Sequence, residues 1–285
     1  MNFARPLSVG SRAYQEPLDE DQLRKLAPSI FAPDKHDSRS DRYTYIPTWE
    51  IVRELMNEGF EPMHATQGRS RIEGKAAFTK HMVRFRHGTA EMRQVGDTRP
   101  EIVLINSHDG TSSYRIMAGL FRLICLNGMV VSDALVDDVR VGHSGKIADK
   151  VLEGTWSVVS QVDQVMRRPV EWAGVDLSQG ERLAIAKAAH ELRFEDTSDT
   201  MQDAIKPVTL LVPRRHEDMG DDLWSTFNRL QENVIRGGVS GRGRDAEGRI
   251  RNVTTRPVRN IDQDVKLNRA LWVLAEEMAK LKTAA

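Results

Sequence analysis

The chain has 285 residues, of which 40% are hydrophobic and 29% charged, and its formal net charge is zero. This length allows one large domain or two modest ones with a genuine core, and the composition is too apolar for a disordered chain. Zero net charge excludes a protein whose whole surface binds polyanions, the apolar runs exclude a membrane-spanning helix, and the single cysteine, Cys125, excludes an intrachain disulfide, so we expect a cytoplasmic protein.

The charges are sorted along the chain even though they cancel overall. Residues 67–93 carry seven basic and two acidic side chains, and residues 236–259 carry seven arginines and two acidic side chains. The compensating stretch is 195–222, with eight acidic and three basic residues. Such segregation favours local contact with a charged partner.

The first part of the chain predicts an extended lead-in over 1–42, with a short helix at 19–27, followed by an α+β sheet region over 43–143. Thr48 is the expected N-cap of an amphipathic helix that ends at Gly59. From 60 to 131 the apolar period changes to two, and glycines separate the runs. We expect a curved antiparallel sheet backed by the helix at 48–58.

One predicted strand, FTKHMVRFRH, combines cations with apolar side chains on one face. Alternation places Phe78, Lys80, Met82, Arg84 and Arg86 together. Aromatic and basic side chains on an exposed sheet face are typical of a single-strand nucleic-acid binder, because bases stack while phosphates are held electrostatically. A sheet face covered by a helix is the alternative.

The loop NSHDGTSS at 106–113 is rich in hydrogen-bonding groups. Asp-Gly between apolar runs indicates a turn whose Asn, Ser and Thr side chains bind loop amides. The alternatives are a ligand-contacting loop and a catalytic site formed by Asn106, His108 and Asp109. Asp109, or another loop carboxylate, is a candidate partner for Arg122, which interrupts an apolar run.

The histidines could form a metal site only if distant residues converge, because the sequence has no HExxH or CxxC spacing. His64 and His81 fall in neighbouring predicted strands and could meet across a sheet, together with His108. Hydrogen-bonded strand histidines are the simpler interpretation. We expect no cofactor and no metal, with this cluster as the alternative.

After 144 the pattern predicts a mainly helical region over 144–285. Valines at heptad-like spacing indicate a helix over 145–166, and Ser178 with Glu181 has the form of a capping box. An apolar run predicts a strand at 207–213. Helices are expected at 223–238, stopped by two glycines, and at 265–281.

The Gly/Arg segment 236–259 predicts a mobile arm or hairpin. It lacks the lysine and the preceding strand of a phosphate-binding loop. Arginine offers a fixed charge and a forked donor that suit phosphate groups. We therefore expect nucleic-acid contact here, through Arg242, Arg244, Arg249, Arg251 and Arg256. The alternative is a solvated loop that pairs with the acidic stretch 195–222.

Several long segments carry a resemblance to a known family: HDSRSDRYTYIPTWEIVRELMNEGFEP, TKHMVRFRH, PEIVLINSHDGTSSYRIMAGLFRLICLNGMVV, RRHEDMGDDLWSTFNRLQENVIRGGVSGRG and NIDQDVKLNRALWVLAEEM. The chain resembles the phage- and plasmid-borne family of domains of unknown function numbered nine hundred and thirty-two, especially its cryptic-prophage members in enteric bacteria. The resemblance covers nearly the whole chain and is weakest over 167–206. It implies a setting of prophages, plasmids and integrative elements, where proteins of DNA replication, recombination or defence are common, but no particular activity.

These observations together predict a non-enzymatic nucleic-acid-binding protein of a mobile element, a homo-oligomer that binds single strands or anneals them, with DNA preferred to RNA and no membrane partner. The expected order of one helix and four strands is similar in layout to strand-annealing proteins, which is analogy alone. One alternative is a metal-dependent, nuclease-like enzyme that processes phosphoryl groups. The other is a protein-binding regulator or defence antagonist that acts through residues 195–222.

Overall fold

The computed structural model describes residues 16–38, 45, 47–72, 74–89, 97–122, 127–130, 139–141, 147–195, 197, 199–245 and 247–284. The chain divides into two compact units. The first consists of residues 1–126 and 138–160, and the second of residues 127–137 and 161–285. Cys125 lies outside the described residues.

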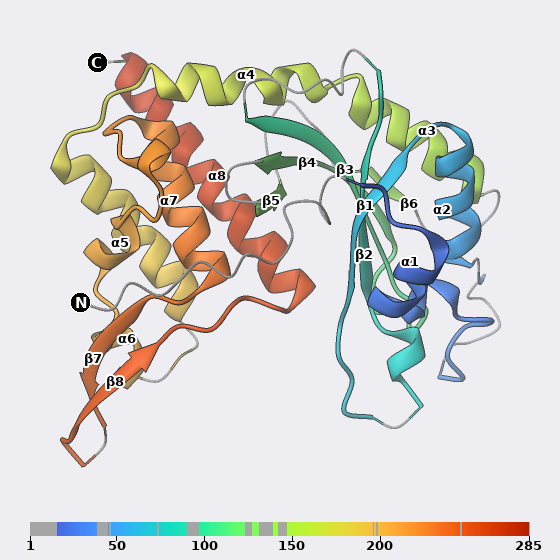
Figure 1. Ribbon diagram of the computed structural model, residues 1–285, viewed down its shortest axis with the longest axis horizontal. Coiled ribbons are helices and arrows are strands. Elements are labelled where there is room, and N and C mark those ends of the chain that lie inside the picture. The colour runs from blue at the N-terminus through green and yellow to red at the C-terminus, as the bar shows by residue number, and fades with distance from the viewer. Residues whose placement is uncertain are drawn as a thin grey trace. The chain divides into compact units, whose positions relative to one another are not determined.

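An antiparallel sheet forms the centre of the first unit (Figure 1). Its strands β1 (Glu61–Gln67), β2 (His81–Arg86), β3 (Thr98–Asn106) and β4 (Tyr114–Arg122) follow one another in chain order, and β6 (Val139–Val141) pairs with the first part of β4. Side chains on these strands alternate between two buried faces. The α+β class and the antiparallel sheet predicted from the sequence are therefore confirmed.

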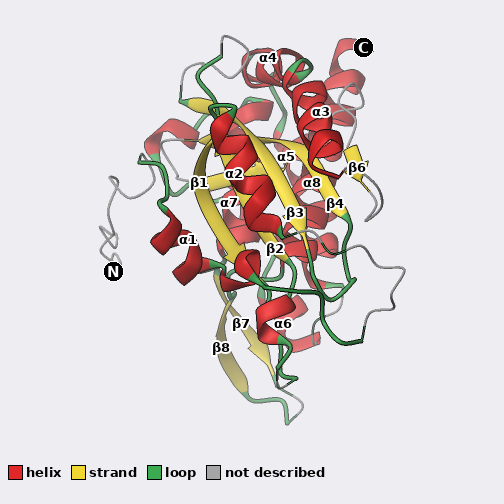
Figure 2. Cartoon of the chain, turned by 90° about the vertical axis from the view of Figure 1, so that its right-hand side faces the viewer, coloured by secondary structure: helices red, strands yellow, loops and turns green. Residues whose placement is uncertain are grey.

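Helices cover one face of this sheet, as Figure 2 shows for α2. The helical elements of the first unit are α1 (Glu20–Leu26), η1 (Pro28–Phe31), α2 (Thr48–Asn57), η2 (Ala76–Phe78) and α3 (Ile147–Val159). The stripe predicted for α2, Ile51, Val52 and Leu55, is fully buried. Helix α3 approaches the same face so closely that a Cβ added at Gly154 would lie 3.1 Å from Ile116 Cδ1.

Thr48 does not have the role that the sequence predicted. The N-cap of α2 is Pro47, and Thr48 is the first helical residue, with a fully buried side chain. Its hydroxyl group binds side chains of β2, of β3 and of the loop after β3, so it is not available to cap the helix. The end of α2 is as expected, because Gly59 takes a φ of 89° that favours glycine.

The second unit is mainly helical. Its elements are β5 (Asn127–Val130), α4 (Val162–Ala173), α5 (Gln179–Phe194), α6 (Asp199–Ala204), η3 (Pro207–Leu211), η4 (His216–Asp218), α7 (Leu223–Arg236), β7 (Ser240–Arg244), β8 (Ile250–Thr254) and α8 (Ile261–Ala284). Aromatic rings form its core: the centroid of Trp172 lies 4.6 Å from that of Trp272 and 5.5 Å from that of Phe227. Helix α7 is buried on all sides from Leu223 to Val234.

Two predictions for this half of the chain are wrong in detail. The helix expected over 145–166 breaks at 160–161, where the Ser160 hydroxyl donates to the Ser157 carbonyl, a local bond that competes with the helix. The strand expected at 207–213 is the short helix η3. Its carbonyl groups find another donor, because the amide Nδ2 of Asn233 on α7 lies 2.8 Å from Leu210 O and 3.0 Å from Val212 O. The capping box of Ser178 and Glu181 is confirmed.

Candidate nucleic-acid interface

The Gly/Arg segment forms a two-stranded antiparallel hairpin of β7 and β8, which we call the basic hairpin (residues 240–254). The register pairs Ser240 with Thr254, Arg242 with Asn252 and Arg244 with Ile250. Directly paired residues share a face, so these six side chains lie on one side, and all six are exposed. We call this side the outward face.

Asp245 organises the tip of the basic hairpin. Its backbone N–H donates to Arg249 O at 3.0 Å, and its side chain accepts from Arg249 N at 2.8 Å. The second carboxylate oxygen pairs with Arg251 Nε at 2.9 Å. These contacts with Arg251 and Arg249 hold the pKa of Asp245 below its ordinary value. Gly248, with a φ of 75°, completes the reversal.

Positive charge dominates the surface of this segment. Residues 240–259 contain six arginines and two acidic residues, and all six arginine side chains are exposed. Among the described residues, Arg251 is the one arginine of the six that pairs with a carboxylate. In the described part of the structure, Arg242, Arg244, Arg249 and Arg256 form no ion pair with a carboxylate.

The acidic stretch 195–222 uses its carboxylates elsewhere. Glu195 binds Lys266 at 2.6 Å, Asp221 pairs with Arg182, and Asp222 accepts a hydrogen bond from the backbone N–H of Ser225 at the start of α7. Within the described part of the chain, no ion pair joins this stretch to the basic hairpin. The alternative of intramolecular neutralisation thus receives no support from these contacts.

The inner face of the hairpin rests on α6 through a glycine. A Cβ at Gly241 would lie 1.9 Å from the Ala204 carbonyl oxygen and 3.2 Å from Ile205 Cδ1. Real Cβ atoms do not approach this closely, so any other residue here would push β7 away from the end of α6. Gly241 therefore serves close packing, and the outward face remains exposed.

Two arginines fix the base of the hairpin to the end of α7. Arg193 donates to Val234 O at 3.1 Å and to Arg256 O at 3.0 Å. Arg214 donates to Asn233 Oδ1 at 2.6 Å and also to the Gly237 carbonyl. The last carbonyl groups of a helix lack intrahelical partners and carry partial negative charge, so cations stabilise them. The segment is thus a clamped hairpin, the second of the two forms that its sequence predicted.

The second predicted basic surface is not exposed. Alternation in β2 is as expected, but Arg84 and Arg86 are only 3% and 6% exposed. Glu101 of β3 binds both, with its carboxylate oxygens 2.6 Å from Arg84 Nε and 3.0 Å from an Arg86 terminal nitrogen. The Arg86 guanidinium also lies 4.5 Å from the centre of the Phe121 ring.

The prediction of an exposed binding face at β2 is therefore wrong for Arg84 and Arg86. Buried charges are stable only when paired, and these two share one carboxylate that strand alternation brings to the same face. Lys80 precedes the strand and is half-buried, and Phe78 belongs to η2. No row of aromatic and basic side chains forms on an exposed face from these residues.

A buried hydrogen-bond network explains much of the NSHDG sequence. Thr48 Oγ1 lies 2.8 Å from His81 Nε2, 2.9 Å from Asn106 Nδ2 and 3.2 Å from His108 Nε2. Because His81 Nδ1 faces the carbonyl oxygen of Thr79 at 3.1 Å, it donates there, and its Nε2 then accepts from the Thr48 hydroxyl. Thr48 in turn accepts from Asn106 and His108. The network joins α2 to the ends of β2 and β3.

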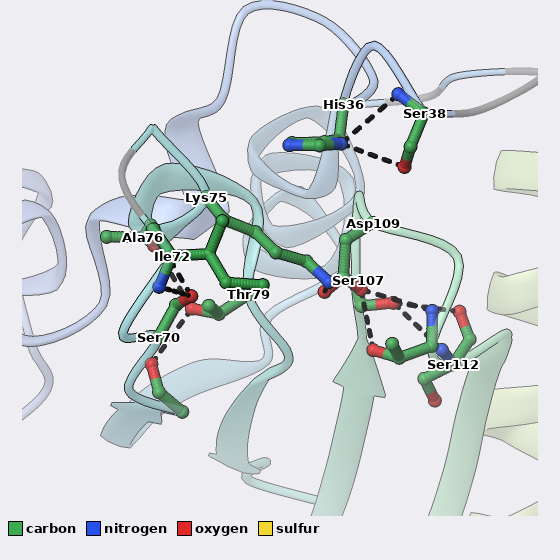
Figure 3. Close-up of polar contacts among 12 residues, drawn as sticks. His36, Ser38, Ser70, Ile72, Lys75, Ala76, Thr79, Ser107, Asp109 and Ser112 are labelled. Carbon is green, nitrogen blue, oxygen red and sulfur yellow. Dashed lines mark hydrogen bonds and ion pairs between the residues drawn. The ribbon is translucent and has the colours of Figure 1, made fainter.

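Asp109, the residue after His108, forms an ion pair with Lys75, which Figure 3 shows. Lys75 Nζ, from the loop between β1 and β2, lies 3.2 Å from Asp109 Oδ2. The Thr111 hydroxyl and backbone N–H donate to Asp109 Oδ1 at 2.6 and 3.1 Å. Burial raises the pKa of Asp109, but the hydrogen bonds from Thr111 and Lys75 outweigh it and hold the pKa below its ordinary value.

Asp109 is consequently not the partner of Arg122. Arg122 Nε lies 2.6 Å from Asp97 Oδ2, so the partner is another loop carboxylate. The candidate catalytic residues Asn106, His108 and Asp109 are all buried and lie beside one another in the chain. Their side-chain contacts with Thr48, Lys75 and Thr111 connect loops and strands of the first unit, as expected for the structural interpretation of this loop.

The three-histidine cluster is not formed. His64 pairs in register with Arg84, so it lies on the opposite face of the sheet from His81. His81 and His108 do meet, with ring centres 5.2 Å apart. Burial, with Arg84 adding to it, lowers the pKa of His64 to about 4. Burial and the neighbouring His108 lower the pKa of His81 to about 3, so both imidazoles are neutral. No group of three potential metal ligands converges among the residues that the structure describes.

Sequence reasoning missed the residues that position the hairpin. Arg193 and Arg214 lie far from it in sequence, and their role depends on backbone carbonyls that no side-chain pattern reveals. The sequence does contain a pattern that indicates the role of Gly241. Glycines alternate with arginines in SGRGR, so one face of β7 carries no side chains and can pack closely, while the other face carries the cations.

The model of the domain of unknown function DUF932 matches residues 35–272. The UPF0380 protein YafZ of Escherichia coli (strain K12) is 45% identical over 265 residues, which is 92% of either chain. The UPF0380 protein YfjQ of the same organism is 44% identical over 265 residues, with the same coverage. No solved structure matches the chain. Every helix in the described part of the chain is too short or too polar to cross a membrane.

Proposed function

The chain belongs to the DUF932 family of domains of unknown function, and since that name specifies no activity, we propose from the geometry that it is a nucleic-acid-binding protein whose contact surface is the basic hairpin. The observation that carries the proposal is the set of exposed arginines on a clamped hairpin. Among the described residues, Arg242, Arg244, Arg249 and Arg256 have no carboxylate partner.

Electrostatics support a polyanionic partner. Like charges held close together on one hairpin repel one another, and a phosphate backbone relieves this repulsion while it releases counterions. Guanidinium groups bind phosphate oxygens through two parallel hydrogen bonds, which lysines cannot provide. The anchored base means that little conformational freedom is lost when the hairpin binds.

The proposal rests on the hairpin alone, because Arg84 and Arg86 are buried. The mobile-element setting implied by the family resemblance favours DNA over RNA. It is also the reason for proposing that the chain works as part of a homo-oligomer that binds or anneals strands.

Binding of fluorescein-labelled DNA should be measured by anisotropy at several salt concentrations, with light scattering on the same samples to give the oligomeric state. We expect affinity to fall steeply as salt rises, by roughly one power of salt concentration per phosphate contact. The double variant Arg242→Ala/Arg244→Ala should lower affinity at least tenfold and make binding less sensitive to salt.

The matched control is Arg53→Ala/Arg167→Ala, which removes two exposed arginines from α2 and α4 and changes the net charge by the same amount. It should bind as the unchanged protein does. Absence of binding at low salt, or equal losses in the two double variants, would reject the basic hairpin as a nucleic-acid contact.

A further inference from the structure

We infer that the basic hairpin recognises the base sequence of duplex DNA. Its outward face would lie in the major groove, where Arg242 and Asn252 contact base edges. This inference rests on the proposed function and narrows it. The proposed function requires only sequence-independent attraction to phosphates. The inference adds recognition of bases in double-stranded DNA.

The dimensions and support of the hairpin suit this role. A major groove about 12 Å wide admits a two-stranded ribbon, and five residues per strand extend about 16 Å. On the inner face, α6 packs against Gly241, whereas all six side chains of the outward face are exposed, so the outward face offers the broader surface to a ligand. Figure 1 shows β7 and β8 extending away from the helices α5 and α7 of the same unit.

The side chains on the outward face are those that read bases. Arg242 lies directly opposite Asn252, and Arg244 lies opposite Ile250. Arginine binds the two acceptors of guanine, asparagine binds the acceptor and donor of adenine, and an apolar side chain contacts the thymine methyl group. Ile250 is 66% exposed, which is unusual for isoleucine and leaves it free for such a contact.

The remaining arginines are placed to hold the backbone. Arg249 lies at the tip and Arg256 at the base, so they lie beyond the two ends of the paired strands. Contacts of this kind position a protein on the duplex without specifying sequence. The basic hairpin therefore combines central base-reading groups with phosphate-binding groups at its ends.

Other nucleic-acid forms fit this surface less well. Proteins that bind single strands stack bases on aromatic rings, and residues 236–259 contain no Phe, Tyr or Trp. Double-stranded RNA has a major groove too narrow for side chains to read. The outward face accordingly favours B-form DNA over both.

The test compares four probes of equal length: random-sequence DNA duplexes, the corresponding single strands, double-stranded RNA of random sequence, and DNA duplexes in which 7-deazaguanine replaces guanine. The natural DNA duplex should bind more tightly than the single strand and the RNA. Loss of the guanine N7 acceptor should weaken binding to sequences selected from the random pool by about tenfold. Sequencing the bound DNA from that pool gives the base preference at each position.

Asn252→Ala separates base reading from phosphate attraction. This exposed variant should keep the salt slope and fold unchanged, the latter checked by thermal unfolding, while preference at one position of the selected sequence falls roughly fivefold or more. The control is Asn57→Ala, an exposed asparagine at the end of α2.

Three other outcomes would contradict the inference. Salt-sensitive binding with a preference for single strands or RNA would overturn duplex reading but leave the proposed function standing. Duplex binding with no sequence preference, or an Asn252→Ala variant that selects the same sequences, would overturn base reading alone. Absence of binding to every probe would overturn the inference and the proposed function together.

Discussion

The Thr48 hydroxyl contacts His81, Asn106 and His108 at once. Replacing it with valine keeps the side-chain shape but removes the donor and acceptor on which three buried groups depend. A buried polar group left without a partner costs about 1–3 kcal/mol, so we expect Thr48→Val to lower the free energy of unfolding by roughly 2–4 kcal/mol in urea titrations.

Thr48→Ser is the matched control, because it keeps the hydroxyl and loses one buried methyl group. It should cost only about 1 kcal/mol. If the serine and valine variants are equally stable, the hydroxyl is not what holds α2 against the ends of β2 and β3.

At the scale of the element, the basic hairpin can pack against the end of α6 only because residue 241 is glycine. Gly241→Ala would place a methyl group against the Ala204 carbonyl, and neither the carbonyl nor the strand can move without loss of other contacts. We expect the hairpin to open locally, which should raise the rate of trypsin cleavage after its arginines about tenfold and weaken DNA binding.

Gly180→Ala is the control for this substitution, since a Cβ at Gly180, in α5, meets nothing within 4 Å. It should leave trypsin cleavage and DNA binding unchanged. Resistance of the Gly241→Ala hairpin to trypsin, at the level of the unchanged protein, would show that the glycine is not needed for docking.

The elements differ in how far the sequence predicts them, for physical reasons. Local signals suffice for α7 and for the capping box at Ser178, because hydrophobic period and capping chemistry act within a few residues. They fail at 207–213, where an apolar run becomes η3 after Asn233, distant in sequence, takes its carbonyl groups.

The candidate site likewise contains residues whose positions the sequence predicts and residues whose positions it does not. Exposed arginines on a Gly-rich hairpin follow from composition and alternation, so the basic hairpin was predicted. The fate of Arg84 and Arg86 was not, because two cations facing one way look identical in sequence whether they meet solvent or Glu101. Burial is set by what packs on a strand, and that is a property of the fold.

At the scale of the whole molecule, the two compact units have different titratable cores. The first contains His64 and His81, whose pKa values burial lowers to about 4 and about 3. The aromatic core of the second consists of groups that do not titrate, Trp172, Phe227 and Trp272. Mild acid should therefore act on the sheet unit through these two imidazoles.

The direction of this pH effect follows from the linkage between proton binding and folding. An unfolded histidine binds a proton near its ordinary pKa of about 6.5, whereas His64 and His81 stay neutral in the folded sheet. Their stabilising contribution is complete above about pH 6.5 and is lost as pH falls toward their folded pKa values. Near pH 5 the loss is about 2 kcal/mol for each histidine.

Hydrogen exchange at neutral pH and near pH 5, corrected for intrinsic rates, tests this expectation. Amide protection in β1 and β2 should fall at the lower pH, while protection in α7 and α8 should persist. His64→Gln and His81→Gln should each make the stability of the sheet unit less dependent on pH, whereas His216→Gln, at an exposed position, should not. Equal loss of protection in the two units would mean that they unfold as one body, and an unaltered pH dependence in the β1 and β2 variants would mean that neither buried imidazole controls acid stability.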